Sequence, residues 1–392
     1  MTVAPFLLLL AATAGWILLP LLPAIRELVA PTDAEPLNAV GHDAGDLTVF
    51  ADGFRDYLLR QLRPSALQPP SALLAAPAAE SGAAGVTAGG GEEAGLPTAT
   101  PRALIGTLGD GTPFVQLADD ATALREVEHT DGTIPRVVIA ARALALPGGE
   151  TFLLELLARE AFQGGAGAVY RAVLGEHDVS LGERSEVLRW AHAAGDLRVG
   201  RGSMLHGRAS AVGRLLLGPG VTFRRVRATR VVAGDVGEND APPLHDPPTL
   251  PPVISGTVKL PAGAKRERGY TRIAGDFTVP PGGVLVGSLV VMGRLTVGDG
   301  ARIGGSEKTH ADCVLGADVV VDGTIVSRGL VSTGAHCHVR GSVVAERDAS
   351  IGAGSWVGEA KHPASVSAES VVLAAGAQVF GAVSARKGAR VG

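Results

Sequence analysis

The C-terminal part of the chain carries apolar residues at alternate positions, in a pattern that recurs every eighteen residues. In one such unit Leu295 and Val297, then Ile303, alternate with polar residues between glycine-rich corners, which is typical of short strands. The period persists from residue 275 to 364, and eighteen residues are too few for a helical hairpin. We therefore predict an all-β protein, a β-helix (solenoid) with eighteen-residue coils that each contact only their neighbours. The predicted inward columns are Val279, Val297, Leu315, Thr333 and Ile351, and Leu285, Ile303, Val321, Val339 and Val357.

The same frame fits an earlier part of the chain. Its inward columns there are Leu181, Val199 and Leu217, and Val169, Val187, Leu205 and Phe223. We predict a first part of the β-helix over residues 151–234 and a second part over 273–392. Residues 235–272 interrupt the pattern with prolines that cannot donate ladder hydrogen bonds, so they form either a loop excluded from one solenoid or a linker between two. The frame returns after four extra residues at the corner of His362 and Pro363.

The N-terminal segment is apolar. Residues 3–25 carry no charged side chain, and this apolar segment is long enough to span a bilayer. We therefore predict a transmembrane anchor over residues 1–30. A cleaved signal peptide is the alternative, although no Lys or Arg precedes the run and no clear small-x-small site follows it. Because the first arginines follow the segment, the positive-inside rule places the C-terminal bulk in the cytoplasm.

Three further segments precede the coils. Residues 31–63 contain a predicted juxtamembrane amphipathic helix that lies on the membrane or packs against the solenoid. Its apolar face holds Phe50, Phe54, Tyr57, Leu58 and Leu62. Residues 64–102 are rich in Ala, Gly and Pro and predict a disordered linker, and residues 103–150 predict an irregular β cap.

Composition narrows the functional classes. Aromatic residues make up 4% of the chain and glycine accounts for 54 of 392 residues, which suits narrow coils rather than a core of large rings. The net charge of −4 gives no basic footprint for nucleic acid. Cys313 and Cys337 lie at different places in adjacent coils, so we expect two buried thiols and no disulfide.

Histidine is the residue type with the most catalytic potential here. His310, His336, His338 and His362 fall at four different places of the repeat, so no two stack on one side. We expect solvent-facing corner histidines, no catalytic residue, no metal site and no cofactor.

The rival interpretation is a hexapeptide-repeat acyltransferase. Val297-Gly298 and Ile303-Gly304 match the apolar-glycine start of that repeat, but the third side does not. There the expected apolar place holds Thr309, Ser327, Ala345 and Pro363. Such an enzyme would also need a histidine as general base.

Two further features bear on partners. The basic run 223–227 is either a patch for anions or lipid headgroups, or a solvated face whose arginine stems cover apolar edges, and we favour the latter. The chain ends partway round a coil with no cap, which predicts an end that meets another copy. The candidate polymerisation end consists of Val379, Phe380, Ala389 and Val391.

Residues 295–305, 319–326 and 338–345 resemble the coils of bactofilins, a family of bacterial polymer-forming cytoskeletal proteins. The likeness covers residues 273–392 well and earlier coils, such as 197–207, more loosely. It implies a narrow right-handed β-helix that forms non-polar filaments end to end without nucleotide and is tied to the inner membrane. The expected function is therefore a membrane-anchored scaffold that self-associates into a homopolymer, with envelope or morphogenesis proteins as a further class of partner. The acyltransferase and an exported envelope β-helix are the alternatives.

Overall fold

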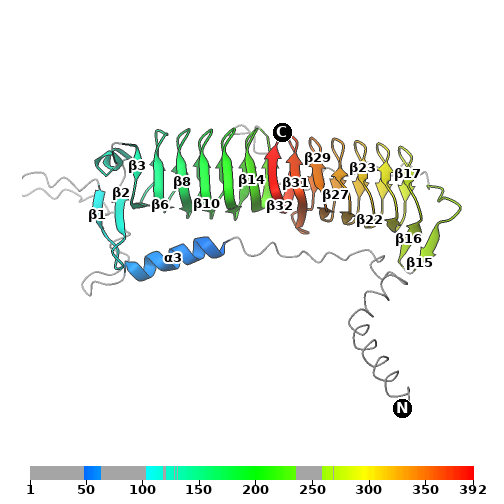
Figure 1. The fold of residues 1–392 in the computed structure, drawn as a ribbon, viewed down its shortest axis with the longest axis horizontal. Helices are drawn as coiled ribbons and strands as arrows, with labels where there is room; N and C mark the ends of the chain where they lie inside the picture. The colour runs from blue at the N-terminus through cyan, green and yellow to red at the C-terminus, as the bar shows by residue number, and fades with distance from the viewer. Residues whose placement is uncertain are drawn as a thin grey trace, which may run out of the picture.

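The computed structural model describes residues 48–62, 103–117, 121–127, 129, 131–234, 258–267 and 269–392. Strands dominate these residues and form a β-solenoid, which confirms the predicted fold class (Figure 1). The predicted anchor at 1–30 and the predicted linker at 64–102 lie outside the described residues. Within the described part of the chain, no helix has the length and apolarity needed to cross a bilayer.

The first half of the solenoid comprises residues 133–234. The first coil has three short strands, each middle coil has one long strand that covers two sides and one short strand on the third, and the last coil has a single long strand. Each strand pairs in parallel with its counterpart in the next coil. Its strands are β3 (Thr133–Ile134), β4 (Val137–Ala140), β5 (Leu144–Ala145), β6 (Thr151–Ala158), β7 (Phe162–Gln163), β8 (Val169–Gly175), β9 (Val179–Leu181), β10 (Glu186–Ala193), β11 (Leu197–Val199), β12 (Met204–Ala211), β13 (Arg214–Leu217) and β14 (Thr222–Ala233).

One predicted column of this half is wrong by one residue. Val187 pairs with Tyr170, and Tyr170 is fully buried, whereas Val169 is only partly buried. This coil is one residue short of the period, and a slip of one position exchanges the inward and outward faces of a strand. The neighbouring column of Leu181, Val199 and Leu217 is confirmed.

The second half, residues 270–392, follows the eighteen-residue period closely. Val279 pairs with Val297, Val297 with Leu315, and Leu285 with Ile303. Its strands are β16 (Tyr270–Ile273), β17 (Phe277–Val279), β18 (Val284–Leu285), β19 (Ser288–Val291), β20 (Leu295–Val297), β21 (Arg302–Ile303), β22 (Glu307–Thr309), β23 (Cys313–Leu315), β24 (Val320–Val321), β25 (Ile325–Ser327), β26 (Val331–Ser332), β27 (His338–Val339), β28 (Val343–Ala345), β29 (Asp348–Ile351), β30 (Trp356–Val357), β31 (Ala364–Leu373) and β32 (Gln378–Val391).

The predicted four-residue insertion is also found. Ile351 pairs with Leu373 instead of a residue eighteen positions later, and Glu359 and His362 bridge each other in a tight turn. The turn projects from the coil, so the inward columns continue on either side of it.

The two halves run in opposite directions along one rod. Figure 1 shows the first half proceeding from the cyan end to β14, and the second half starting at the far end and returning to β32 beside β14. Strands β14 and β32 are antiparallel, whereas the coil-to-coil pairings on either side of them are parallel. Residues 235–272 therefore connect two solenoids that stack end on end, an arrangement that combines the two predicted alternatives.

A hairpin covers each outer end of the rod. Strands β1 (Ala103–Thr107) and β2 (Pro113–Leu117) form one hairpin, with the short 3-10 helix η3 (Ala121–Glu126) behind it, and β2 pairs with β4. Strand β15 (Lys265–Glu267) pairs with β16 at the other end. The predicted cap at 103–150 thus also contains the first coil, and the ordered coil structure reaches back to residue 258, inside the predicted insertion.

The two end hairpins differ in chemistry. Leu104 and Ile105 of β1 are exposed, at 45% and 48% of their surface, respectively. In β15 all three residues are charged and exposed: Lys265, Arg266 and Glu267. Charged edges oppose strand addition and apolar edges permit it.

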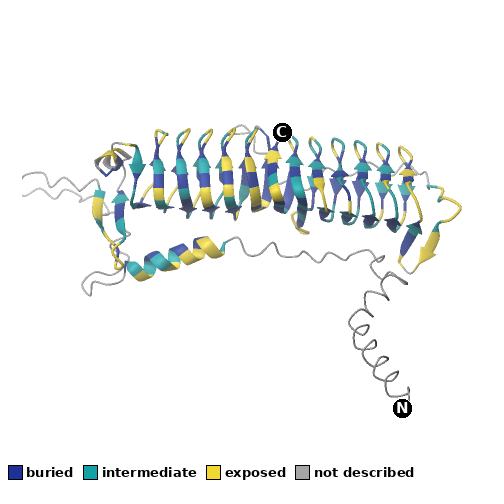
Figure 2. Ribbon diagram, in the orientation of Figure 1, coloured by how far each residue is buried: buried dark blue, intermediate teal, exposed yellow. Residues whose placement is uncertain are grey.

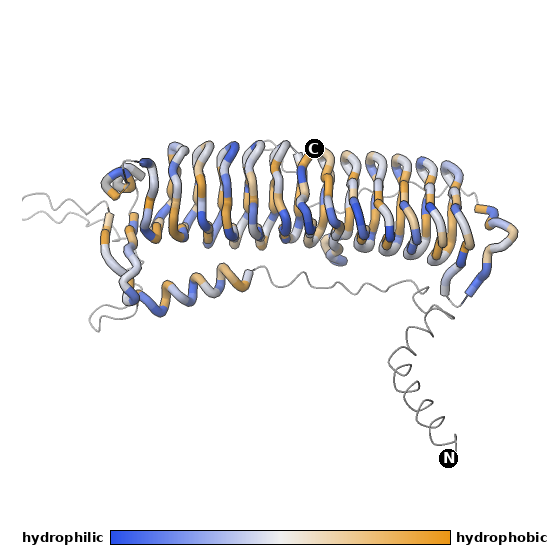
Figure 3. The backbone as a smooth tube through the Cα atoms, in the orientation of Figure 1, coloured by the Kyte–Doolittle hydropathy of each residue, from blue (hydrophilic) through white to orange (hydrophobic). Residues whose placement is uncertain are grey.

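Alternating burial fills the solenoid with a single apolar core (Figure 2). The hydropathy along the chain alternates in the same way within the coils (Figure 3). Helix α3 (Val49–Gln61) packs outside, where Phe54 contacts Trp190 at a ring distance of 5.8 Å and Leu58 is buried. Of the two predicted positions for this helix, it takes the one on the solenoid.

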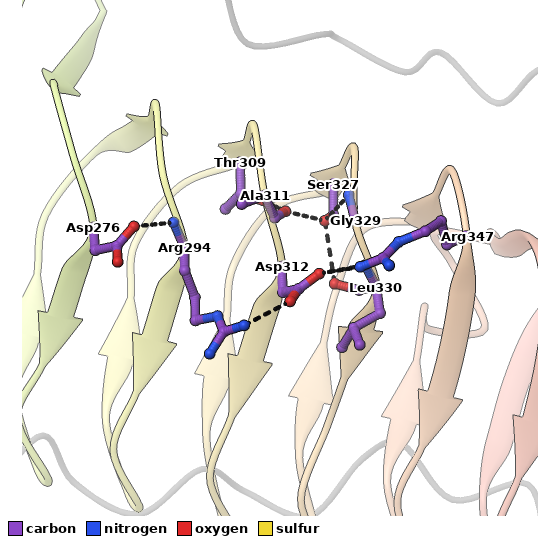
Figure 4. Close-up of polar contacts among 9 residues, drawn as sticks. All are labelled: Asp276, Arg294, Thr309, Ala311, Asp312, Ser327, Gly329, Leu330 and Arg347. Atoms are coloured by element: carbon purple, nitrogen blue, oxygen red, sulfur yellow. Dashed lines mark hydrogen bonds and ion pairs between the residues drawn. The ribbon is translucent and has the colours of Figure 1, made fainter.

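Polar corner residues connect successive coils of the second half (Figure 4). The Arg294 backbone N–H donates to Asp276 Oδ1 at 2.8 Å, and the Leu330 N–H donates to Asp312 Oδ1 at 3.1 Å. The side chains of Arg294 and Arg347 both reach Asp312, at 2.9 and 2.6 Å. The backbone N–H of Leu330 and the two arginines lower the pKa of Asp312.

Candidate functional site: the junction between the solenoid halves

The junction between β14 and β32 pairs the last coils of the two halves on all three sides of the rod. Thr222 lies opposite Arg390, Val226 opposite Val383, and Val231 opposite Val379. Further backbone bonds close the corners: Val391 N–H donates to Val221 O at 2.9 Å and Gly376 N–H donates to Ala233 O at 2.7 Å. The strand ladder and the apolar core therefore continue from one half into the other.

The β14–β32 pairing contains two bulges, the first with its extra residues on β32, and the two strands turn the corners of the coil there while they stay paired. Opposite the second bulge, Gly381 has a φ of +132°, and a Cβ at this position would lie 2.3 Å from Ala364 O. Only glycine fits this close approach of β32 to β31, the neighbouring strand of the same half. The corner thus depends on a residue that the repeat alone would not distinguish from the other glycines.

An arginine fastens the outer surface of the junction. Arg230 is only 1% exposed, and its guanidinium donates to Gln378 Oε1 through Nε at 2.8 Å and also through Nη2. It lies 5.2 Å from the ring of Trp356 and 5.4 Å from that of Phe380. Burial, together with the nearby charge of Arg214, lowers the pKa of Arg230. Cation–π contacts and the amide acceptor compensate for removing this cation from water.

The predicted open end is therefore closed within the chain. Val379 and Ala389 pair with β14, Phe380 is 1% exposed under Arg230, and Val391 is 2% exposed. The expectation that these four residues present an uncapped end to a second copy is corrected, because the first half of the same chain occupies that position.

Comparisons of this chain with known proteins give no match. No family model matches it. No curated protein and no solved structure matches it either.

The four candidate histidines do not converge. His336 and His362 are exposed, as predicted, and His310 is partly buried. His338 is a correction: it is buried between Val320 and Trp356 in the outward row of its side, and Glu359 Oε1 lies 3.7 Å from its Nε2. Burial lowers the pKa of His338, against the opposing charge of Glu359. Among the described residues, no group of three or more His, Cys, Asp or Glu is arranged to hold a metal ion.

Sequence reasoning missed a carboxyl group in the core. Glu307 is 1% exposed and faces inward between Leu289 and Ile325, and the thiol of Cys313 donates to its Oε2 at 3.6 Å. Desolvation raises the pKa of Glu307 to about 8. The sequence contained a signal for this residue, because the eighteen-residue period aligns Glu307 with the apolar residues Leu289 and Ile325 and so predicts that it faces the core. Cys313 and Cys337 are buried free thiols, as expected.

The junction also gathers positive charge. Arg224, Arg225 and Arg227 are exposed on β14, and β32 adds exposed Lys387 and Arg390 from the opposite half. A groove of about 360 Å³ crosses the junction, and its lining includes His206, Arg224, Lys387 and Arg390. The sequence contained the run at 223–227, but only the antiparallel pairing of the two halves brings the second set of cations beside it.

Proposed function

We propose that this protein is a non-catalytic scaffold, a membrane-tethered rigid rod whose architecture is bactofilin-like. The observation that carries the proposal is the tail-to-tail junction, in which two solenoids of one chain share a strand ladder and a core. At ~4.8 Å per strand the stack is on the order of 60 Å long. A continuous ladder resists bending, so the rod can hold partners at fixed separations.

The tether is proposed from sequence. Residues 3–25 are long and apolar enough for a single span, with the bulk of the chain in the cytoplasm and the inner membrane as the site of attachment. Helix α3 supports this arrangement because its docking on the solenoid fixes where the preceding chain leaves the rod. A tether that enters through a docked helix holds the rod at a defined distance from the membrane.

Self-association has to use an outer end of the rod, since the inner ends are paired with each other. The β1 edge offers Leu104 and Ile105, while strand β15 offers only charged residues. We therefore expect rods to join through β1 edges. Joining of one end only produces pairs of rods, in contrast to the open filament that two equivalent ends would produce.

The full chain, purified in mild detergent, tests this proposal by light scattering and negative-stain electron microscopy. We expect straight rods and, with rising concentration, rods joined end to end. Replacing Leu104→Lys together with Ile105→Lys should leave single rods. The matched control, Val212→Lys with Leu188→Lys, changes two exposed apolar residues of middle coils and should still pair.

Two results would count against the proposal. Single rods at every concentration would contradict the proposed self-association. Rods that bend at mid-length would contradict the proposed rigid junction. The acyltransferase alternative would gain support from an acetyl-CoA-dependent activity that is lost in a His338→Ala variant, since His338 is the one of the four candidate histidines whose Nε2 has a carboxylate beside it among the described residues.

A further inference from the structure

The junction carries a cluster of cations that neither half possesses alone. We call it the junction basic patch, and its residues are Arg208, Arg224, Arg225, Arg227, Lys387 and Arg390. We propose that this patch docks the rod against an anionic lipid surface, so that the rod lies along the membrane that holds its N-terminus. The inference rests on the membrane tether of the proposed function and extends it.

Adjacent like charges are the first observation in favour. Arg208 and Arg225 are direct cross-strand neighbours on the same face, and Arg227 is two residues further on. Like charges in this position repel each other and destabilise a sheet. No ion pair joins Arg224, Arg225 or Arg390 to any of the described residues, and Lys387 has a single acidic partner, Glu369, at 3.2 Å. An anionic surface would relieve this repulsion.

The surroundings of the patch favour lipid over other anions. The ring of Phe50 lies 4.8 Å from the guanidinium of Arg208, and Phe50 and its neighbour Val49 are 45% and 57% exposed. Exposed apolar residues beside cations suit the interface of a bilayer, where the former enter the headgroup region and the latter meet phosphates. The net charge of −4 disfavours a general nucleic-acid surface.

The position of helix α3 completes the argument. The N-terminal end of α3 points toward the junction along the underside of the rod (Figure 1), and Arg208 is the residue under Phe50. The chain before Thr48 contains the apolar residues 3–25, separated from the helix by 22 residues (26–47). The N-terminal end of α3 therefore lies beside the patch, so the chain that precedes the helix joins the rod next to these cations.

The groove of the junction gives the lipid headgroup a place to bind. Arg224 and His206 line it from the first half, and Lys387 and Arg390 line it from the second. A phosphate there would be shared by both halves. Binding to the membrane would consequently strengthen the junction itself.

A fluorescent label at Ser384 tests this proposal in the full chain. Ser384 lies opposite Arg225, and the two native cysteines are buried, so a Ser384→Cys variant accepts a polarity-sensitive thiol dye at one position. The labelled chain is reconstituted into vesicles of phosphatidylcholine alone, or of phosphatidylcholine with ~30% phosphatidylglycerol, which is enough anionic lipid to create a negative surface potential. We expect a blue shift and quenching by spin-labelled lipid with the anionic vesicles only.

Variants separate the patch from charge in general. Arg224→Gln, Arg225→Gln and Arg227→Gln together should weaken binding to the anionic vesicles about a hundredfold, and high salt should weaken it as well. Lys259→Gln, Lys265→Gln and Arg266→Gln together remove the same charge from the far end and should leave the signal unchanged. Because all six side chains are exposed, both triple variants keep the fold, which circular dichroism checks.

Three outcomes would overturn the proposal. The first is equal signals with neutral and anionic vesicles. The second is loss of the signal when millimolar inorganic phosphate is added, which would indicate a site for a free anion. The third is the same shift with a soluble oligonucleotide in place of vesicles. Co-flotation of the chain with neutral vesicles reports on the N-terminal tether separately, so failure of the patch and failure of the anchor are distinguishable.

Discussion

The two halves of the solenoid reach the same coil by different means. The first half uses strands of up to eight residues in its middle coils, an interior stack of Phe152 on Tyr170 at 5.2 Å, and helix α3 on its outside. The second half uses strands of two to four residues through its regular coils, with polar corner ladders between them. The first half has an aspartate corner ladder as well, in which Asp196 N–H donates to Asp178 Oδ1 at 2.8 Å, so the halves differ in strand length and in aromatic packing. A strict period can thus replace long strands and large side chains.

The comparison predicts that removing helix contacts weakens the first half alone. Phe54→Ala deletes a buried ring that contacts Trp190 and should cost about 4 kcal/mol of local stability. Hydrogen exchange read by mass spectrometry should show faster exchange in β6, β8 and β10, and unchanged exchange in β20 to β27. Val49→Ala, an exposed change in the same helix, is the control. Equal loosening of both halves would mean that the solenoid unfolds as one unit.

The second half should carry a pH dependence that the first lacks. Glu307 has an ordinary pKa of 4.5 in the unfolded chain and a pKa of about 8 in the fold. The folded state thus retains a proton that the unfolded state loses, and stability falls as pH rises from about 4.5 to about 8. Glu307→Gln should abolish this fall, a gain of about 4 kcal/mol at the upper end of the range.

Urea unfolding at pH 5 and pH 8 would measure this effect. Glu346→Gln changes an exposed carboxylate of the same half and should leave the pH dependence intact. Identical pH profiles for Glu307→Gln and the unmodified protein would show that the buried carboxyl does not set it.

The corner ladder should give the smallest effect. Asp312 accepts a backbone N–H and two arginines at a surface where water screens charge, so Asp312→Ala should cost about 1 kcal/mol at neutral pH. Because the pKa of Asp312 is lowered from 3.8, its contribution is present above that value and is lost as the pH falls through the lower, folded-state pKa.

Thermal unfolding at pH 7 and in more acidic buffer would reveal the difference between Asp312→Ala and the unmodified protein. The difference should shrink in acid. Asp348→Ala, at an exposed position of the next coil but one, is the control and should be neutral at both pH values. A penalty for Asp312→Ala that stays constant into acid would point to packing rather than to the carboxylate.

Sequence alone determined much of the coil. Alternation of apolar residues fixed which side chains face inward, and the eighteen-residue period fixed which residues stack, as Leu285 on Ile303 illustrates. Even the shift of register after Arg347 could be read, because the inward columns resume on either side of it. These features depend on contacts between adjacent coils, and adjacent coils repeat in the sequence.

Only the tertiary structure decided how the two halves meet. The inward columns of β14 and β32 are the same whether a neighbouring coil runs parallel or antiparallel, so alternation contains no information on direction. Neither the burial of Arg230 nor that of His338 follows from the repeat, since both side chains point outward. Arg230 is covered by Gln378 and Phe380 of the other half, and His338 lies beside Glu359 in the turn that interrupts the repeat. The sequence predicted an open end at the last coil. In the structure the unpaired backbone N–H and C=O groups of that coil pair with β14, the last strand of the other half of the same chain.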